Sequence, residues 1–474
     1  MATGARRGER DRRAARLRRE RAARDDRHCG STDRVTSDIT MRRACVLALL
    51  VVLSSRVGAE RLDALGPCGP VDRPYDPVEV AASKLPGLKG TPIARLAVVA
   101  FRGGHGRPIP FQVDQRSGHK LALPEGSEPT RPAHLGVVGP DDLVVFMACD
   151  AGERAAPAEV AKLGALSREI HLDDPVDHRA GFVYLVATDS PPASAARYVT
   201  YEPHGDLVTT ARYRVGMVNA LPNYFAVGSD GGFGPNLLDG LRLRADATLL
   251  ADLAHWQLNE QQGDHQLVAW KAGPVRVVRR SLHEVRIGLG IHLTAARAHS
   301  YFYPRHVFGP GSMKLPVSPG WVFRDITALG GADFRDLRGW RYHAPGTPPE
   351  GFHVDGHMDD AERTFDATGD WFVLAHGEQA LMMVTRMSEN LRRAVRLKLV
   401  YVDDADRHAP PEAVAGSVPL VGYRGLDVER LPADRYQFQL RIFNLTPYHA
   451  GDERRVLSQL DAPLRVDVTP ADGH

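Results

Sequence analysis

Apolar and polar residues alternate with a period of two along much of this 474-residue chain, and this pattern restricts the fold more than any other feature. The clearest example is residues 285–293 (VRIGLGIHL), in which every second residue from Ile287 to Leu293 is aliphatic. Successive side chains of a strand point to opposite faces of a sheet, so this spacing predicts a strand with one buried face. The 45 glycines and 34 prolines favour short elements joined by turns. We therefore expect an all-β protein.

Two further patterns predict how the strands are organised. Residues 95–101 (RLAVVAF) and 109–114 (IPFQVD) are separated by a glycine-rich segment and predict a β-hairpin. Proline and glycine residues mark a boundary near residue 205, which divides the chain into two β-sandwich-type domains, residues 60–205 and a larger one, 206–474. Helical patterns are few, and we expect helices only at 157–166 (PAEVAKLGAL) and 237–243 (LLDGLRL).

The segment that begins at Met41 has the three parts of a secretory signal peptide. Two arginines precede a ten-residue apolar run, residues 44–53, which is too short to span a bilayer. Small residues follow and end at Ala59, so we expect cleavage there and a secreted chain that starts at Glu60. This chain would act in the periplasm or outside the cell.

Residues 1–40 have a different composition from the rest of the chain. They contain twelve arginines and seven acidic residues with no apolar periodicity, which predicts a disordered leader. Clustered arginine is also typical of a nucleic-acid-binding arm. The alternative is that translation starts at Met41, because a signal peptide must lie near the true N-terminus.

Removal of residues 1–59 reverses the sign of the net charge. That segment holds fifteen of the 60 basic residues and seven of the 58 acidic ones, so the remainder is acidic, near −6. The basic balance of the whole chain therefore gives no reason to expect a nucleic-acid partner. No apolar run after residue 59 approaches the roughly 18 residues of a membrane span, so we expect no transmembrane segment in the secreted part.

Only two cysteines, Cys68 and Cys149, follow the expected cleavage site. An even pair in an oxidising compartment predicts one disulfide, while two separate thiols remain the alternative.

Residues 299–306 (HSYFYPRH) combine residue types that suit proton abstraction from an acidic sugar. An arginine can neutralise a uronate carboxylate while a tyrosine or histidine moves the proton next to it. The candidate catalytic residues are His299, Tyr301, Tyr303 and Arg305. The alternative is a strand with ordinary aromatic packing.

Residues 351–360 (GFHVDGHMDD) place imidazoles and carboxylates at two-residue spacing. If the segment is extended, these side chains share one face and could bind a divalent metal ion such as Zn²⁺, Mn²⁺ or Fe²⁺. The candidate ligands are His353, Asp355, His357 and Asp359. The alternative is a solvated loop in which aspartate and glycine form turns. Residues 171–178 (HLDDPVDH) likewise predict either a turn or a calcium site.

Three short motifs carry a resemblance to known proteins. Residues 108–114 (PIPFQVD) and 141–154 (DDLVVFMACDAGER) resemble motifs of secreted bacterial β-rich proteins, most of them of unknown function and some similar to proteins associated with polysaccharide use. Residues 272–276 (AGPVR) resemble the start of a strand in sugar-active supersandwich domains. The resemblance implies a carbohydrate-related role and a supersandwich-like second domain, and it assigns no catalytic residue.

These observations predict a secreted protein of a bacterial envelope that binds or processes a polysaccharide or glycoconjugate. A metal-binding periplasmic protein and a non-catalytic interaction module are the two alternatives. A divalent metal ion is the only cofactor that the sequence suggests.

Overall fold

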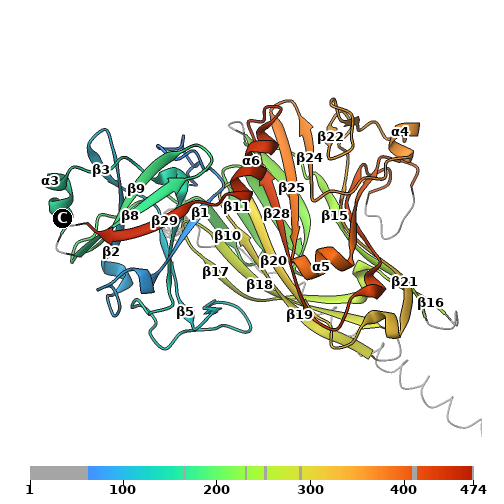
Figure 1. Cartoon of the computed structure of the whole chain (residues 1–474), viewed down its shortest axis with the longest axis horizontal. Coiled ribbons are helices and arrows are strands. Elements are labelled where there is room, and N and C mark those ends of the chain that lie inside the picture. Colours follow the sequence, from blue (N-terminus) through green and yellow to red (C-terminus); the bar gives the residue numbers. More distant parts are fainter. Residues whose placement is uncertain are drawn as a thin grey trace, which may run out of the picture. The chain divides into compact units, whose positions relative to one another are not determined.

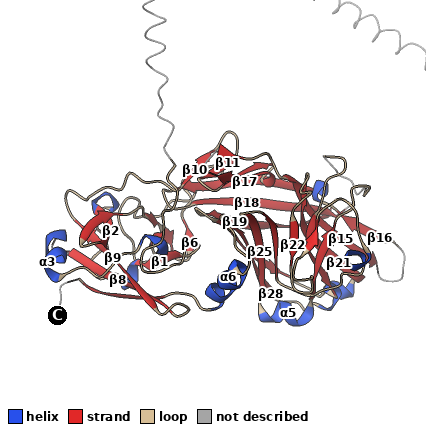
Figure 2. Cartoon of the chain, turned by 90° about the horizontal axis from the view of Figure 1, so that it is seen from above, coloured by secondary structure: helices blue, strands red, loops and turns tan. Residues whose placement is uncertain are grey.

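A computed structural model describes residues 62–164, 166–229, 232–249, 254–287, 291–407 and 414–471 of the chain. The leader predicted at 1–40 and the signal peptide predicted at 41–59 lie outside these residues. The described residues fall within one compact unit, Glu60–His474. Strands dominate it, as Figure 2 shows, and the all-β prediction is confirmed. The described α-helices are α3 (Pro157–Val160), α4 (Asp360–Arg363), α5 (Glu389–Ala394) and α6 (Asp452–Asp461).

The N-terminal part is a sandwich of two sheets. A three-stranded sheet has the order β1 (Pro77–Ala81), β7 (Leu143–Met147) and β4 (Gln112–Asp114). A five-stranded sheet has the order β29 (Arg465–Pro470), β8 (Leu166–Asp174), β9 (Arg179–Ala187), β2 (Leu96–Arg102) and β3 (His105–Pro108). Alternate apolar side chains of both sheets form one core between them, including Val80, Val144, Val98, Ile170 and Val183. A small hairpin, β5 (Arg116–Ser117) and β6 (Lys120–Leu121), accompanies them.

Strand β7 contributes to two cores at once. Val144 and Phe146 belong to the N-terminal core, whereas Val145 and Met147 belong to the large core of the rest of the chain. All five residues of β7 are buried for this reason. A strand that is covered on both faces has an unbroken apolar sequence rather than an alternating one, which explains the run LVVFM.

Three larger sheets make up the rest of the chain. One has five strands in the order β10 (Val199–Glu202), β11 (Leu207–Thr210), β12 (Tyr213–Val218), β13 (Leu221–Ser229) and β14 (Gly232–Phe233). Another has the order β16 (His255–Leu258), β15 (Leu238–Leu249), β21 (Phe323–Phe334), β27 (Leu420–Leu426) and β26 (Arg396–Val402). The third has nine strands, in the order β17 (Gly263–Ala272), β18 (Val277–Ile287), β19 (Ile291–Phe302), β20 (His306–Lys314), β28 (Arg435–Asn444), β25 (Gln379–Met387), β24 (Trp371–His376), β22 (Arg341–His343) and β23 (Phe352–His353).

One hydrophobic core joins these sheets. Tyr213 comes from the first of them, Tyr423 from the second and Phe302 and Phe372 from the nine-stranded sheet. The sequence therefore builds a second and larger sandwich, as expected. Helix α6 covers the other face of the nine-stranded sheet, where its Val456 packs with β24, β25 and β28.

Two local predictions are wrong. Residues 237–243 are not helical, because Leu238–Leu249 forms strand β15 between β16 and β21. The hairpin that starts with β2 has its second arm at His105–Pro108 and not at 109–114: Ile109 still donates to the carbonyl of Val98 at 2.9 Å, but Gln112–Asp114 pairs with β7 in the other sheet. Hydrogen-bonding partners far away in the sequence override the local pattern in both cases. The helical segment at 157–166 is present but short, with α3 followed by the 3₁₀ turn Ala161–Leu163.

The chain returns to its N-terminal sandwich at the end. Strand β29 pairs antiparallel with β8, and Figure 1 shows the red C-terminal strand beside the green one. The proposed division at residue 205 stays a prediction, and the described fold adds that the last strand belongs to the first sandwich.

The predicted disulfide between Cys68 and Cys149 is confirmed, with 4.3 Å between the two Cα atoms. It connects the segment before β1 to the 3₁₀ turn Ala148–Asp150 that follows β7. None of the helices described is long and apolar enough to cross a membrane.

Candidate functional site

A buried ion pair joins two of the motifs that the sequence analysis singled out. Arg276, just before β18, donates to Asp114 on β4 from Nε at 2.8 Å and from Nη2 at 2.5 Å. Both side chains are almost fully buried, at 1% and 0% exposure. Lys271 on β17 donates to the other oxygen of Asp114 at 2.7 Å. The pair connects positions 162 residues apart in the chain.

Gln112 fixes the backbone around this pair. Its amide nitrogen donates to Asp114 at 2.8 Å, and its amide oxygen accepts from the backbone nitrogen of Arg276 at 3.0 Å. A Cβ atom at Gly273 would lie 2.0 Å from that amide oxygen, so only glycine permits the close approach. The motifs PIPFQVD and AGPVR therefore pack on each other.

The charges in this cluster stabilise one another. Burial alone would raise the pKa of Asp114, but the cations of Arg276 and Lys271 outweigh it and hold the pKa well below its usual range. Arg276 also donates to Glu79 on β1 and, at 2.5 Å, to the hydroxyl of Tyr303. Glu79 is 40% exposed on its side chain, so the cluster reaches the surface there.

An aromatic strip, defined here as His299, Tyr301 and Phe308, crosses neighbouring strands beside this cluster. The rings of His299 and Tyr301 lie 6.4 Å apart, and those of Tyr301 and Phe308 lie 5.7 Å apart. The guanidinium of Arg276 lies 5.1 Å from the Tyr301 ring, and that of Arg441 lies 4.5 Å from the Phe308 ring. The three members of the strip are all partly exposed.

Three of the four predicted catalytic residues lie close together, and the arginine beside them is Arg276 and not Arg305. His299 and Tyr301 belong to the strip, and Tyr303 is fully buried against Arg276. Arg305 interacts instead with Tyr75, whose phenol has its pKa raised to about 12 by burial. The guanidinium beside the two tyrosines is that of Arg276. The AGPVR motif was the signal that could have identified it.

Protonation states restrict what these side chains can do. Burial raises the pKa values of Tyr301 and Tyr303 above their ordinary value, so both phenols keep their protons at neutral pH. Burial, and then the positive charge of Arg280, lowers the pKa of His299. His299 is therefore the neutral group of the strip that can accept a proton.

The predicted metal ligands lie at a strand end, in the loop that follows it and at a helix cap, and all four side chains are exposed. Asp355 accepts from the backbone nitrogen of His357 at 2.9 Å, and Asp359 caps α4 by accepting from Glu362 at 2.8 Å. His353 ends β23. Within the described ranges, no three His, Cys, Asp or Glu side chains are grouped so that they could hold a metal ion. The metal site therefore stays a prediction.

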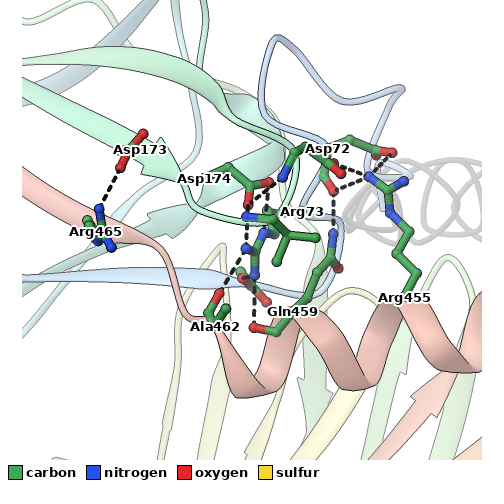
Figure 3. A network of polar contacts seen from close by, with 11 residues as sticks. Asp72, Arg73, Asp173, Asp174, Arg455, Gln459, Ala462 and Arg465 are labelled. Atoms are coloured by element: carbon green, nitrogen blue, oxygen red, sulfur yellow. Dashed lines mark hydrogen bonds and ion pairs between the residues drawn. The ribbon is translucent and has the colours of Figure 1, made fainter.

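Residues 171–178 contain the turn between β8 and β9, and one aspartate of this segment holds a second buried ion pair (Figure 3). Asp174 receives two hydrogen bonds from Arg73, at 2.5 and 3.0 Å, and both side chains are 0% exposed. Arg73 also donates to the carbonyl oxygens of Gln459 and Ala462 at the end of α6, both at 2.9 Å. A cation at a helix C-terminus is favourable, so this arginine attaches α6 to the N-terminal sandwich.

A cavity of about 300 Å³ lies elsewhere on the molecule. Arg386 on its wall is paired with Asp370 and, at 3.1 Å, with Asp461. The cavity shares no residue with the Arg276 cluster or the aromatic strip, so we do not assign the candidate functional site to the cavity. Its lining residues are Asp370, Thr385, Arg386, Met387, Arg392 and Asp461.

His306 next to the strip predicts a pH dependence of stability. It is 3% exposed, it stacks on Tyr303 with 4.5 Å between ring centroids, and burial lowers its pKa to about 3. The folded state therefore keeps it neutral, while the unfolded chain takes up a proton below about pH 6.5. Stability present above that pH is lost as the pH falls towards 3, by about 1 kcal/mol per pH unit.

Substitution of His306 by phenylalanine should remove this contribution, so the variant should lose less stability than the wild type between neutral pH and about pH 4. Denaturant unfolding at several pH values measures the difference. His449, whose side chain is 76% exposed, provides the control in His449→Gln. Parallel pH curves for the wild type and His306→Phe would contradict the assignment.

No protein-family model matches the chain, and no curated protein matches it. Solved structures show distant similarity. An α-mannosidase from Enterococcus faecalis is 10% identical with a TM-score of 0.42, and the match covers 91% of this chain and 49% of that one. An α-N-acetylgalactosaminidase from Bifidobacterium bifidum is 11% identical with a TM-score of 0.34, covering 54% and 38% of the two chains. A putative aldose 1-epimerase from Escherichia coli is 10% identical with a TM-score of 0.30, covering 53% and 99%.

The chain spans about half the length of the Enterococcus proteins that it matches. Similarities at these identities and TM-scores assign no activity to this chain.

Proposed function

We propose that the protein acts outside the cytoplasm and binds a polysaccharide or glycoconjugate along the aromatic strip. The observation that carries this proposal is the pair of partly exposed rings, Tyr301 and Phe308, held between the guanidiniums of Arg276 and Arg441. Aromatic rings offer apolar surface to the C–H groups of a sugar. Charged and polar groups at the edges, such as Glu79, can accept hydrogen bonds from its hydroxyls.

Two features of the chain support the proposed location outside the cytoplasm. The predicted signal peptide at residues 41–59 would export it, and the disulfide between Cys68 and Cys149 suits an oxidising compartment. N-terminal sequencing of the protein exported by a Gram-negative host should begin at Glu60. A mature protein that still begins at Met1 or Met41 would contradict the export proposal.

Replacing Tyr301 by alanine should weaken glycan binding about fivefold or more, because a buried aromatic contact at an interface is worth at least about 1 kcal/mol. Tyr301→Phe keeps the ring and should bind nearly as well as the wild type. The matched control is Trp321→Ala, which removes an aromatic side chain that is 73% exposed outside the strip. Polysaccharide arrays identify the ligand, and calorimetry measures its affinity for each variant.

Equal losses in Tyr301→Ala and Trp321→Ala would contradict a site at the strip. Absence of binding to any polysaccharide would favour the alternative of a non-catalytic module that contacts another envelope protein. If the protein also cleaves the polysaccharide, His299 is the proton acceptor, and Arg276, in place of Arg305, neutralises the carboxylate of the sugar. This version of the proposal requires that the bound polysaccharide is shortened during incubation, and unchanged chain length after binding would remove it.

A further inference from the structure

A second polar cluster lies on β17 and β18 and takes no part in the site described above. The hydroxyl of Ser281 lies 2.6 Å from Nε2 of His283, and Nδ1 of His283 lies 2.8 Å from Nδ1 of His265. Ser281 and His283 are two residues apart on one strand, so their side chains project from the same face. His265 is the antiparallel partner of His283 on the neighbouring strand.

The hydrogen bonds define the role of each ring nitrogen. If the hydroxyl of Ser281 donates to Nε2 of His283, the hydrogen of that ring must be on Nδ1. This Nδ1–H then donates to Nδ1 of His265, which acts as the acceptor. A nucleophile, a base and a group that orients the base are thus arranged in series, as in enzymes that use an activated serine.

The residues around His283 keep it neutral, and one of them, Arg279, offers a hydrogen-bond donor that can stabilise a negative charge. Burial is the largest cause that lowers the pKa of His283 to about 4, and electrostatic interactions with His265 and Arg279 add to it. The side chain of Arg279 is 3% exposed, and its Nε has no hydrogen-bond partner among the described residues. Arg279 precedes Ser281 by two residues on the same face, and its Nη2 is held by Asp206. Its free Nε–H can therefore serve an oxyanion that forms at Ser281.

The geometry points to Ser281 as the nucleophile of a hydrolase that acts on esters of small acyl groups. The hydroxyl oxygen of Ser281 attacks the carbonyl carbon, its proton moves to Nε2 of His283, and Arg279 donates to the resulting oxyanion. The ester C–O bond then breaks, and the alcohol leaves with the proton from His283. Water attacks the acyl-serine, again giving a proton to His283, and the carboxylic acid leaves as that proton returns to Ser281.

Ser281 is only 5% exposed, so the proposed reaction requires a small acyl group. The activity is independent of glycan binding. Ser281 and His283 project from the face of β18 opposite to that of Val278, whose strand partner is Tyr301 of the aromatic strip. Loss of one function therefore need not affect the other.

The test uses the full chain and two probes, a fluorophosphonate that labels activated serines and p-nitrophenyl acetate. We expect a single label, located on Ser281 by peptide mapping, together with acetate release. Ser281→Ala should abolish both, and His283→Gln should slow both by at least about tenfold, because general-base catalysis contributes about 10²–10⁴-fold. The matched control is Ser167→Ala, which removes the hydroxyl of a strand serine that is 1% exposed, a hydroxyl without a hydrogen-bond partner among the described residues.

Absence of a label on Ser281, or an unchanged labelling rate in His283→Gln, would overturn the proposal. Thermal melting shows whether each variant folds. If His283→Gln does not fold, the pH profile of the wild type decides, because a base with a pKa of about 4 gives a labelling rate that is level from neutral pH to about pH 5 and falls below it. A rate that rises steadily with pH through the neutral range would also overturn the proposal.

Discussion

Replacing Arg276 by methionine should lower the free energy of unfolding by about 3–5 kcal/mol, because the substitution leaves a buried carboxylate without its main counter-charge. Asp114 is 0% exposed, and among the described residues its remaining side-chain partners in this variant are Lys271 and Gln112. Methionine fills a similar volume, so lost packing contributes little. Denaturant unfolding followed by tryptophan fluorescence measures the change.

Two further variants separate charge burial from other effects. Arg297→Met removes an arginine whose side chain is 62% exposed and whose ion pair with Glu128 spans 3.4 Å, and it should cost less than about 1 kcal/mol. Combining Arg276→Met with Asp114→Asn should cost less than the sum of the two single substitutions, because the second removes the unpaired charge. A loss of less than about 1 kcal/mol in Arg276→Met would show that the ion pair does not hold the two motifs together.

Removing the disulfide should have an effect of comparable size. Cys68 and Cys149 are 81 residues apart, and a crosslink over a loop of this length restricts the unfolded chain by about 4–5 kcal/mol in the chain-entropy model. Cys149→Ser should therefore lower the melting temperature strongly, and addition of a reducing agent should lower that of the wild type in the same way.

The control for this prediction is the comparison of Cys68→Ser, Cys149→Ser and the double variant. All three lack the same crosslink and should be equally destabilised, and reducing agent should change none of them further. Losses that add in the double variant would instead indicate that each cysteine acts through its own packing.

Short-range patterns predicted much of the fold because they depend on neighbouring residues. Alternating apolar residues predicted an all-β fold, since the side-chain period of a strand is a local property. The strand at Tyr301, part of β19, was expected only as the alternative to a catalytic segment. The helix predicted from the local pattern of residues 237–243 is wrong. Their leucines suit a helix, but β21 and β16 pair with Leu238–Leu249 on its two sides.

The candidate site was only partly predictable. The residue types of 299–306 indicated polar chemistry, and His299 and Tyr301 do lie in the strip. Arg276, Asp114 and Gln112 were visible as motifs, but nothing in the sequence showed that they contact one another. Nothing in the sequence identified Phe308 and Arg441 as site residues, because the contact between them depends on the pairing of β20 with β28.

The sequence by itself predicted that this protein is built from strands, and it favoured a disulfide between its two later cysteines. Side-chain alternation is a local property of a strand, and an even pair of cysteines favours a disulfide in an oxidising compartment. The tertiary structure alone decided which strands are neighbours, and therefore which charges meet. Arg276 finds Asp114 across 162 residues, and Ser281 and His283 meet His265 only because β17 and β18 pair in one register. Register and burial are properties of the assembled sheets, and a shift of one residue would have turned each of these side chains to the opposite face.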